Sequence, residues 1–296
     1  DMNVEVSCGI YHVHGRDKSI NIMCDRAHIA VNSIKGNYAR HVAVYDDSHR
    51  EAIIHSQLIV SEMNRAMEQR QFHVYLQPKF NMETEKIIGA EALVRWVHPE
   101  RGILPPGDFI PIFEHNGFIG QLDLYMFEET CKVLRRWLDG GRQPVPVSVN
   151  LSRVGFYNPK LCEHLYKTAQ KYRLPLDLLE LEVTETAYAS DSRTIHSHIR
   201  QLRRMGFKIL MDDFGSGYSS LNMLKEAPVD QIKLDMRFLS EPDPYGRAET
   251  ILQMVIAMGK ALSIPVLAEG VETKGQVEML KSYSCCLAQG YYYAGP

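Results

Sequence analysis

Residues 91–96 read Glu91-Ala92-Leu93-Val94-Arg95-Trp96, an apolar stretch that carries a carboxylate and a guanidinium. Six later segments resemble it, because each is a short apolar run that ends in polar side chains. These segments are residues 145–150, 178–182, 207–213, 229–235, 264–269 and 285–289. Strands with polar groups at their carboxyl ends and helices between them are typical of the working face of a β/α barrel.

The order of predicted elements supports this fold class. Strands are expected at residues 73–77 and 87–94, and the gap between them is too short for a helical crossover, so this pair is predicted to be antiparallel. The later gaps are long enough for helices, predicted at residues 108–114, 122–138, 160–172, 192–205, 219–224, 246–261 and 274–282. The sequence therefore predicts an α/β protein, a (β/α)8 TIM-like barrel with an antiparallel first strand.

The first 46 residues follow a different pattern. Residues 3–10 alternate like a strand, residues 20–31 resemble a helix, and residues 41–45 form a second short strand. A strand-helix-strand piece of this size buries too little surface to be stable alone. Asp47 and Ser48 are expected to cap a linker helix that runs to about Gln69. The predicted organisation is residues 1–46 as a small fragment, 47–71 as a linker helix and 72–296 as the barrel.

Composition excludes several classes of protein. The chain has 296 residues and a net charge of -3, which gives no general attraction to nucleic acid or to an anionic membrane. It contains no apolar run of about 18 residues that would span a membrane. The six cysteines have no Cys-x-x-Cys spacing, and Cys285 and Cys286 fall in a predicted strand. Free thiols and a cytoplasmic location are expected; no signal peptide is present, and the start at Asp1 is typical of a fragment boundary.

The strand ends collect oxygen ligands. The side chains are Glu91, Asn150, Glu182, Asp212, Asp213 and Glu269. Such ligands suit magnesium or manganese, and bound cations would relieve the repulsion among the carboxylates. The adjacent Asp212 and Asp213 favour two ions, an arrangement that promotes in-line attack at phosphorus. The sequence therefore predicts a two-metal site that acts on a phosphate-bearing ligand.

Further polar residues are expected around these ligands. Lys233 and Asp235 share one face of a strand, where an ammonium can orient a nucleophile or offset phosphoryl charge. Arg95 is placed to bind a phosphate, while Gln77 and Gln289 suit a base edge or a ribose.

Single residues of this kind have ordinary explanations. An isolated Asp or Glu at a strand end is more often a helix cap or a surface ion pair, and Asn150-Leu151-Ser152 alone is typical of a turn. Asp213-Phe214-Gly215 matches the kinase metal-binding triplet, but the chain has no His-Arg-Asp loop. His196 and His198 lie two positions apart on a predicted helix and point away from each other. The joint occurrence of polar groups at six strand ends is what favours one common site.

The chain from about Phe72 to Pro296 resembles the EAL family of cyclic-di-GMP phosphodiesterases. The matching motifs are Tyr75-Leu76-Gln77-Pro78, Glu91-Ala92-Leu93-Val94-Arg95-Trp96, Ser148-Val149-Asn150-Leu151-Ser152, Glu180-Leu181-Glu182-Val183-Thr184-Glu185, Asp212-Asp213-Phe214-Gly215, Lys233-Leu234-Asp235, Ala268-Glu269-Gly270-Val271-Glu272-Thr273 and Gln289-Gly290-Tyr291. Near the site, Lys79 departs from the family, which usually has an apolar residue there.

The resemblance implies hydrolysis of cyclic-di-GMP to linear 5'-pGpG with two Mg²⁺ or Mn²⁺ ions. It implies metal ligands at Glu91, Asn150, Glu182, Asp212 and Asp213, with Asp212 shared by both ions. It implies catalytic roles for Glu269, Lys233 and Asp213, and leaves open whether Lys233 or Glu269 is the general base. The expected substrate contacts are Gln77, Glu91, Leu93, Arg95, Asp235, Glu272 and Gln289.

The resemblance also implies a regulatory loop and a dimer. Glu185 is similar to the family's anchor for the loop from Asp213 to Ser220, and a homodimer is expected through the loop and helix after Asp213. The alternatives are a non-catalytic cyclic-di-GMP receptor, a pure protein-interaction role and, for the chemistry, a general nuclease. No basic stripe with interleaved aromatic residues indicates a nucleic-acid polymer as partner.

The first stretch resembles the C-terminal third of a GGDEF domain. The likeness rests on Val6-Ser7-Cys8-Gly9-Ile10 and on Cys24-Asp25-Arg26-Ala27 through Lys35-Gly36-Asn37. The Gly-Gly-Asp/Glu-Glu-Phe signature is absent from the chain. The resemblance therefore implies a remnant of an upstream domain without diguanylate cyclase activity.

Overall fold

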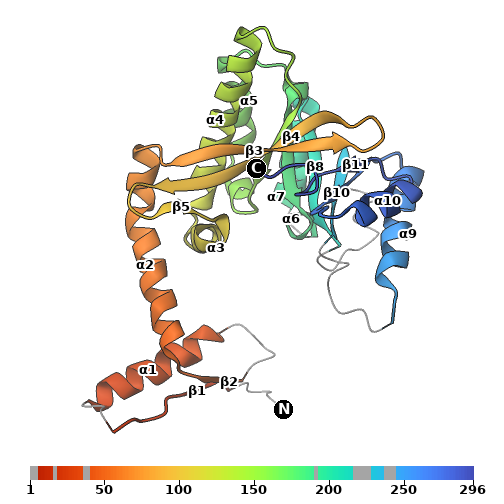
Figure 1. Ribbon diagram of the computed structural model, residues 1–296. Coiled ribbons are helices and arrows are strands. Elements are labelled where there is room, and N and C mark those ends of the chain that lie inside the picture. The colour runs from red at the N-terminus through yellow and green to blue at the C-terminus, as the bar shows by residue number, and fades with distance from the viewer. Residues whose placement is uncertain (1–5, 16–18, 36–40, 190–192, 216–227, 237–244) are drawn as a thin grey trace. The chain divides into compact units, whose positions relative to one another are not determined.

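The computed structural model describes residues 6–15, 19–35, 41–189, 193–215, 228–236 and 245–296 (Figure 1). The chain divides into two compact units, Asp1–Arg65 and Ala66–Pro296, which are described separately. The boundaries predicted at residues 46 and 71 stay predictions. None of the helices in the described ranges combines the length and the apolar character needed to cross a membrane.

The first unit contains the predicted strand-helix-strand piece. Strands β1 (Cys8–Ile10) and β2 (Val42–Val44) pair in parallel, and α1 (Ile20–Ser33) connects them. Gly9 lets α1 approach closely, because a Cβ at this position would lie 2.0 Å from the carbonyl oxygen of Ala27. The small core of the unit consists of Ala30, Ile34, Ala43 and Tyr45.

Helix α2 (Asp47–Glu68) follows, and its cap differs from the prediction. The side chain of Asp46 accepts a hydrogen bond of 2.8 Å from the backbone N–H of Ser48. Asp47 and Ser48 are therefore the first two helical residues, and Asp46 is the cap, because its carboxylate reaches the free N–H two residues ahead.

The second unit is a closed barrel. Strands β3 (Phe72–Asn81) and β4 (Lys86–His98) pair antiparallel, with Gln77 opposite Glu91. The remaining barrel strands are β6 (Val147–Leu151), β7 (Leu179–Thr184), β8 (Lys208–Phe214), β9 (Gln231–Asp235), β10 (Val266–Glu269) and β11 (Leu287–Ala288). They run parallel to β4 in this order, and β11 closes the barrel by pairing antiparallel with β3. The predicted (β/α)8 barrel with a reversed first strand is confirmed.

Two details of the strands differ from the expectation. A short strand that was not predicted, β5 (Gly102–Leu104), extends the sheet beyond β4. The last barrel strand is shorter than predicted, because Cys285 and Cys286 precede β11 and the N–H of Cys285 bonds back to the carbonyl of Leu280. All six cysteines are free thiols.

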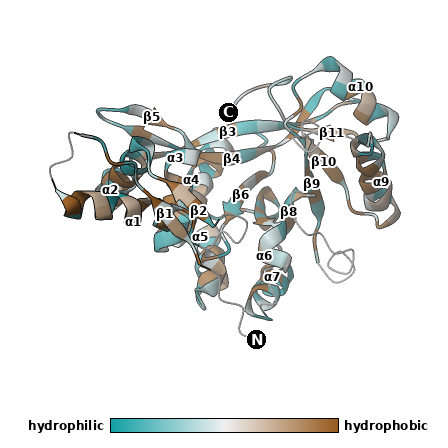
Figure 2. Ribbon diagram, turned by 90° about the horizontal axis from the view of Figure 1, so that it is seen from below, coloured by the Kyte–Doolittle hydropathy of each residue, from teal (hydrophilic) through white to brown (hydrophobic). Residues whose placement is uncertain are grey.

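Helices surround the strands of the barrel. They are α3 (Pro106–Asn116), α4 (Ile119–Asp139), α5 (Leu161–Lys171), α6 (Glu185–Ala189), α7 (Arg193–Met205), α9 (Ala248–Ala261) and α10 (Lys274–Ser282), with 3₁₀ turns η1 (Gly155–Tyr157) and η2 (Leu176–Leu178). In α4, buried Leu122, Met126 and Leu134 recur at helical spacing, and the ribbon carries both apolar and polar residues (Figure 2). The helix predicted at residues 219–224 lies outside the described residues.

An aromatic cluster fixes the end of β4 that leads into the site. Trp96 is fully buried and its ring lies 5.1 Å from that of Phe72 and 5.7 Å from that of Phe109. The indole N–H donates to Gln71 Oε1 at 2.9 Å, so its polar atom is satisfied. Packing of large apolar rings from β3, β4 and α3 around Trp96 holds the preceding residue, Arg95, at a defined place.

Candidate active site

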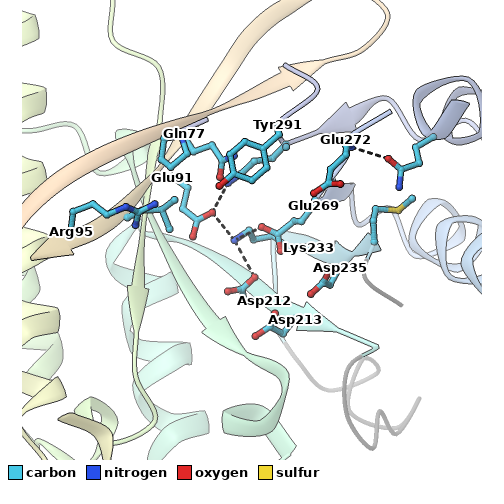
Figure 3. Close-up of a pocket in the computed structure, with 17 residues that line it drawn as sticks. Gln77, Glu91, Arg95, Asp212, Asp213, Lys233, Asp235, Glu269, Glu272 and Tyr291 are labelled. Carbon is cyan, nitrogen blue, oxygen red and sulfur yellow. Dashed lines mark hydrogen bonds and ion pairs between the residues drawn. The ribbon is translucent and has the colours of Figure 1, made fainter. Parts of the chain in front are cut away.

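A cavity of about 420 Å³ opens at the carboxyl ends of the parallel strands (Figure 3). It brings together eleven of the predicted site residues: Gln77, Glu91, Leu93, Arg95, Asp212, Asp213, Lys233, Asp235, Glu269, Glu272 and Gln289. Six further lining residues were not predicted: Met236, Gly270, Gln276, Gly290, Tyr291 and Pro296. A volume of this size is within the range of sites for small organic ligands.

Lys233 lies at the floor of the cavity. It projects from β9 and is 1% exposed. Its Nζ lies 2.5 Å from Glu182 Oε2, 2.8 Å from Glu269 Oε1, 3.0 Å from Asp212 Oδ1 and 3.3 Å from Glu91 Oε2. These contacts come from four different strands, so one ammonium holds together the ends of β4, β7, β8 and β10.

Burial and the two lysines shift the pKa values of the buried glutamates in different directions. Burial raises the pKa of Glu91 and raises that of Glu269 well above its usual value, although Lys233 opposes both shifts. Burial would also raise the pKa of Glu182, but Lys233 and Lys79 outweigh it and lower this pKa to about 2. The pKa of Lys233 lies well above its usual value, because the surrounding carboxylates outweigh the burial that would lower it. Among these three glutamates, Glu182 is the one whose pKa is lowered, so its ionised form is the favoured one.

Two carboxamide side chains orient Glu91 by donating to its carboxylate oxygens. Asn150 Nδ2 donates to Glu91 Oε1 at 3.0 Å, and Gln289 Nε2 donates to Glu91 Oε2 at 2.6 Å. Gln289 Nε2 also reaches Gln77 Oε1 at 3.0 Å, and Gln77 Nε2 donates to the carbonyl of Ala294 at 3.2 Å. This chain of hydrogen bonds links β3, β4, β6 and the C-terminal segment around one carboxylate.

A bulge explains how Asp212 and Asp213 serve the same cavity. Consecutive side chains of a regular strand point to opposite faces. The register between β8 and β9 shifts between Met211 and Phe214, and Asp213 has a φ of 54°. The irregular backbone turns both carboxylates into the cavity, a role that bulges often have beside active sites. The sequence shows the adjacent pair but not the bulge that makes it useful.

Glu185 follows directly after β7 and contacts the segment beyond the aspartate pair. It is buried, and its Oε2 accepts a hydrogen bond of 2.9 Å from the backbone N–H of Gly215. The rest of the predicted loop, from residue 216 onwards, lies outside the described residues. The predicted anchoring role of Glu185 stays a prediction that this contact supports.

Polar and aromatic groups line the mouth. Arg95 Nη1 donates to the carbonyl of Val94 at 2.8 Å, and its guanidinium lies 5.8 Å from the centre of the Tyr75 ring. Glu272, whose N–H donates to Gln276 Oε1, lies on the side opposite Arg95 (Figure 3). Tyr291 also lines the cavity and is 70% exposed. The exposed Tyr291 ring offers a flat surface to a planar ligand.

A second cavity of about 270 Å³ adjoins the first and is lined by both Asp212 and Asp213. Asn150, which does not line the first cavity, lines this one between β6 and α4. Asp123 lies in its wall and accepts hydrogen bonds from the N–H and hydroxyl of Ser152 at 2.9 and 2.6 Å. Burial raises the pKa of Asp123 to about 7, although these hydrogen bonds oppose the shift.

The predicted ligand set fits a hard divalent cation by its chemistry. Five oxygen-bearing side chains are available: Glu91, Asn150, Glu182, Asp212 and Asp213. In the described ranges, no three His, Cys, Asp or Glu side chains are arranged to hold an ion as they stand, and Lys233 draws several of the carboxylates together. Asp212 Oδ1 is buried and accepts no well-aligned hydrogen bond, although Lys233 Nζ is 3.0 Å away. An acceptor of this kind is suited to a cation.

Lys79 is a site residue whose place the sequence did not reveal. It lies two residues after Gln77 on β3, so both side chains point to the same face of the strand. Lys79 is 2% exposed, and its Nζ reaches the predicted metal ligand Glu182 at 3.3 Å. The sequence signal that could have placed Lys79 inside the barrel is its spacing of two residues from the predicted site residue Gln77 on the same strand.

Comparison with known proteins gives consistent matches. The EAL domain family matches residues 60–296. The bifunctional diguanylate cyclase/cyclic di-GMP phosphodiesterase MucR of Pseudomonas aeruginosa is 33% identical over 100% of this chain and 43% of its own length. The cyclic di-GMP phosphodiesterase RocR of the same species is 34% identical over 80% of this chain and 60% of its own length. The chain thus spans less than two thirds of either relative.

A solved structure shares the fold. The PaMucR phosphodiesterase in complex with c-di-GMP aligns with a TM-score of 0.76 and 36% sequence identity. The alignment covers 81% of this chain and 97% of that one.

Proposed function

The chain belongs to the EAL domain family, and from this membership and its site we propose that it hydrolyses cyclic-di-GMP to linear 5'-pGpG. The observation that carries the proposal is Lys233, whose ammonium joins Glu91, Glu182, Asp212 and Glu269 in one buried cluster. Eleven of the predicted site residues line one cavity, Asn150 lines the adjoining one, and Glu182 contacts Lys233 beneath them, which supports the proposal. MucR and RocR, which are named as cyclic di-GMP phosphodiesterases, are consistent with this reaction.

The reaction adds water across one phosphodiester bond. The water oxygen bonds to phosphorus, the bond from phosphorus to the ribose 3' oxygen breaks, and that oxygen takes a proton. Two Mg²⁺ or Mn²⁺ ions bound by Glu91, Asn150, Glu182, Asp212 and Asp213 would stabilise charge on the attacking and leaving oxygens. Their number and identity are part of the proposal.

Lys233 and Glu269 are proposed to handle the proton of the attacking water. They lie 2.8 Å apart, so a proton or a shared water can pass between them. The pKa of Lys233 lies well above its usual value, because the surrounding carboxylates outweigh its burial, so it keeps a positive charge close to the phosphoryl group. Burial raises the pKa of Glu269, which makes it the better proton acceptor of the two, since the ammonium of Lys233 holds its proton firmly.

The remaining residues are proposed to bind the dinucleotide. Arg95 at one side of the mouth suits a phosphate oxygen, and the Gln77 amide suits a base edge or ribose. On the other side, Glu272 can accept hydrogen bonds from a guanine edge. Leu93 and Asp235 line the same cavity between these groups.

The test is incubation of the protein with cyclic-di-GMP and Mg²⁺ or Mn²⁺, followed by separation of the products. We expect pGpG, and we expect its formation to stop with a chelator and to resume when the metal is returned. Glu91→Gln should abolish turnover while the protein stays folded. Tight binding without turnover would favour the receptor alternative, and absence of binding would leave only an interaction role.

The nuclease alternative needs its own control. RNA and DNA oligonucleotides should remain intact under conditions that consume cyclic-di-GMP. The net charge of -3 gives no general attraction for a polyanion, and the cavity is small. Efficient cleavage of oligonucleotides would contradict the proposed specificity.

Two further proposals concern assembly and the first unit. We propose a homodimer formed through the segment after Asp213, which sedimentation velocity tests directly. We also propose that the first unit derives from a GGDEF domain, which is consistent with a match to MucR that extends over the entire chain. This unit should show no diguanylate cyclase activity with GTP, because the signature motif is absent from the chain.

A further inference from the structure

Lys79 is a buried cation in the interior of the barrel, one layer below the cavity floor. Its Nζ lies 2.7 Å from Ser148 Oγ, 3.1 Å from Glu180 Oε2 and 3.3 Å from Glu182 Oε1. An ammonium has three N–H donors, and these three oxygens can use all of them. Glu180 and Glu182 are alternate residues of β7, so Lys79 spans two interior layers of the barrel.

Oxygen partners offset the burial of Lys79. Burying a lysine is costly unless its charge is paired and hydrogen-bonded. Gly89 stands opposite Lys79 in the pairing of β3 with β4. A Cβ on Gly89 would lie at an ordinary contact distance of 3.5 Å from Lys79 Cδ, and its closest neighbour would be the carbonyl oxygen of Pro146 at 3.2 Å. The three oxygen partners, and not the glycine, are therefore what favours a lysine here.

Glu182 is held from both sides by cations. Lys79 binds Oε1 at 3.3 Å, while Lys233 binds Oε2 at 2.5 Å. The final torsion of a glutamate is broad, so a single partner leaves the carboxylate free to rotate. Without Lys79, Glu182 can turn and place both oxygens on Lys233. With Lys79 in place, Oε1 is held by Lys79 and only Oε2 contacts Lys233, at the floor of the cavity.

We propose that Lys79 is a positioning residue that orients Glu182 for metal binding. The inference rests on the proposed function, in which Glu182 is a metal ligand. Partners that orient a ligand without touching the ion commonly change metal affinity by about 10- to 100-fold. Lys79 does this from β3, a strand that supplies no proposed ligand of its own.

The experiment must separate orientation from charge. Lys79→Met alone removes a positive charge near the site, and this by itself would strengthen attraction for a cation. The pair variant K79M/E180Q removes the ion pair of Lys79 with Glu180 and leaves the net charge unchanged. The single variant E180Q is the control for the second substitution, because it removes the charge of Glu180, leaves an amide oxygen that can accept from Lys79, and keeps the contact of Lys79 with Glu182.

The measurement is a titration of the whole chain with Mn²⁺ in the absence of nucleotide. Binding is detected by calorimetry or by the electron spin resonance signal of free Mn²⁺. For K79M/E180Q we expect the dissociation constant to rise by about 10- to 100-fold. For E180Q we expect a change much smaller than that. Saturating Mn²⁺ should restore much of the turnover of K79M/E180Q, because the loss lies in metal binding.

Thermal melting without metal distinguishes a purely structural role. If K79M/E180Q melts earlier than the wild type but binds Mn²⁺ equally well, Lys79 only fills the barrel and the inference is wrong. Tighter Mn²⁺ binding by K79M/E180Q would overturn it as well. If this variant does not fold, K79Q/E180Q, which keeps a shorter N–H donor in the barrel, is judged by the same criterion. Failure of the wild type to bind Mn²⁺ would instead contradict the proposed function.

Discussion

The ammonium nitrogen of Lys233 lies 2.8 Å from Oε1 of Glu269, and the side chains are 1% and 17% exposed. Two groups this close act on the same water and the same proton. Their contributions to turnover should therefore not be independent.

Lys233→Met and Glu269→Gln should each lower kcat by about 10²- to 10⁴-fold, because each removes one half of the proton-handling pair. The double variant should be little slower than either single variant, since residues that act as a unit are strongly non-additive. Steady-state kinetics on all four proteins at saturating metal checks this. Multiplicative losses would show that the two residues act separately.

Metal binding should strengthen as the pH rises. Burial raises the pKa values of Glu91, a proposed ligand, and of Glu269 beside the ligands, so both tend to hold protons that the charge of a bound cation would release. Mn²⁺ titrations from mildly acid to mildly alkaline pH should show a falling dissociation constant. Glu269→Gln should flatten this dependence, because the amide has no proton to release. An equal pH dependence in the variant would assign the proton release to other groups.

Asp123 should make the folded state less stable as the pH rises. Its pKa is raised from 3.8 to about 7, so the folded state binds more protons than the unfolded state between these values. The stability contribution is full below about 3.8 and is lost as the pH approaches about 7, a change of about 4 kcal/mol. The variant Asp123→Asn has no titrating carboxyl group at this position, so its stability lacks this pH-dependent contribution. Denaturant unfolding of both proteins across this range should show the difference between them changing with pH and then becoming constant.

Arg95→Ala should weaken binding of cyclic-di-GMP and leave metal binding intact. The guanidinium lies at the mouth and donates to the carbonyl of Val94 instead of to the carboxylate cluster, as far as the structure describes the chain. A charged hydrogen bond contributes about 1.5–3 kcal/mol. We expect the dissociation constant for cyclic-di-GMP to rise by about 10- to 100-fold. Binding can be measured with Ca²⁺ in place of the active metal. Unchanged nucleotide affinity, or a loss of Mn²⁺ affinity, would contradict this role.

Gly290→Ala should lower both stability and activity. A Cβ at this position would lie 2.2 Å from the carbonyl oxygen and 2.3 Å from the nitrogen of Val271, so the backbone beside Gln289 must move. Gly275→Ala is the matched control: nothing lies within 4 Å of its Cβ position, and it is part of α10. Alanine in a helix is favoured over glycine by about 0.5–1 kcal/mol, so this variant should melt at the same or a higher temperature.

The sequence was sufficient for the barrel because its signals are local and repeated. The short gap before residue 87 predicts the reversed strand, and polar residues at strand ends predict the cavity. The bulge at Asp213 was not predictable, because it depends on the pairing of β8 with β9. The interior place of Lys79 depends on its register with Gly89. The start of α2 was shifted by one residue because Asp46, Asp47 and Ser48 are all competent caps.

The reversed direction of β3 determines where the chain enters the barrel. In an all-parallel barrel the first strand begins at the face opposite the cavity, but β3 begins at the cavity side and descends from it. Its second residue, His73, is paired with Arg95. The segment ahead of Phe72 is thus covalently attached to the strand that adjoins the proposed phosphate-binding arginine. A displacement of that segment would therefore reach His73, which pairs with Arg95, before it reached Gln77, which pairs with Glu91 of the acidic cluster.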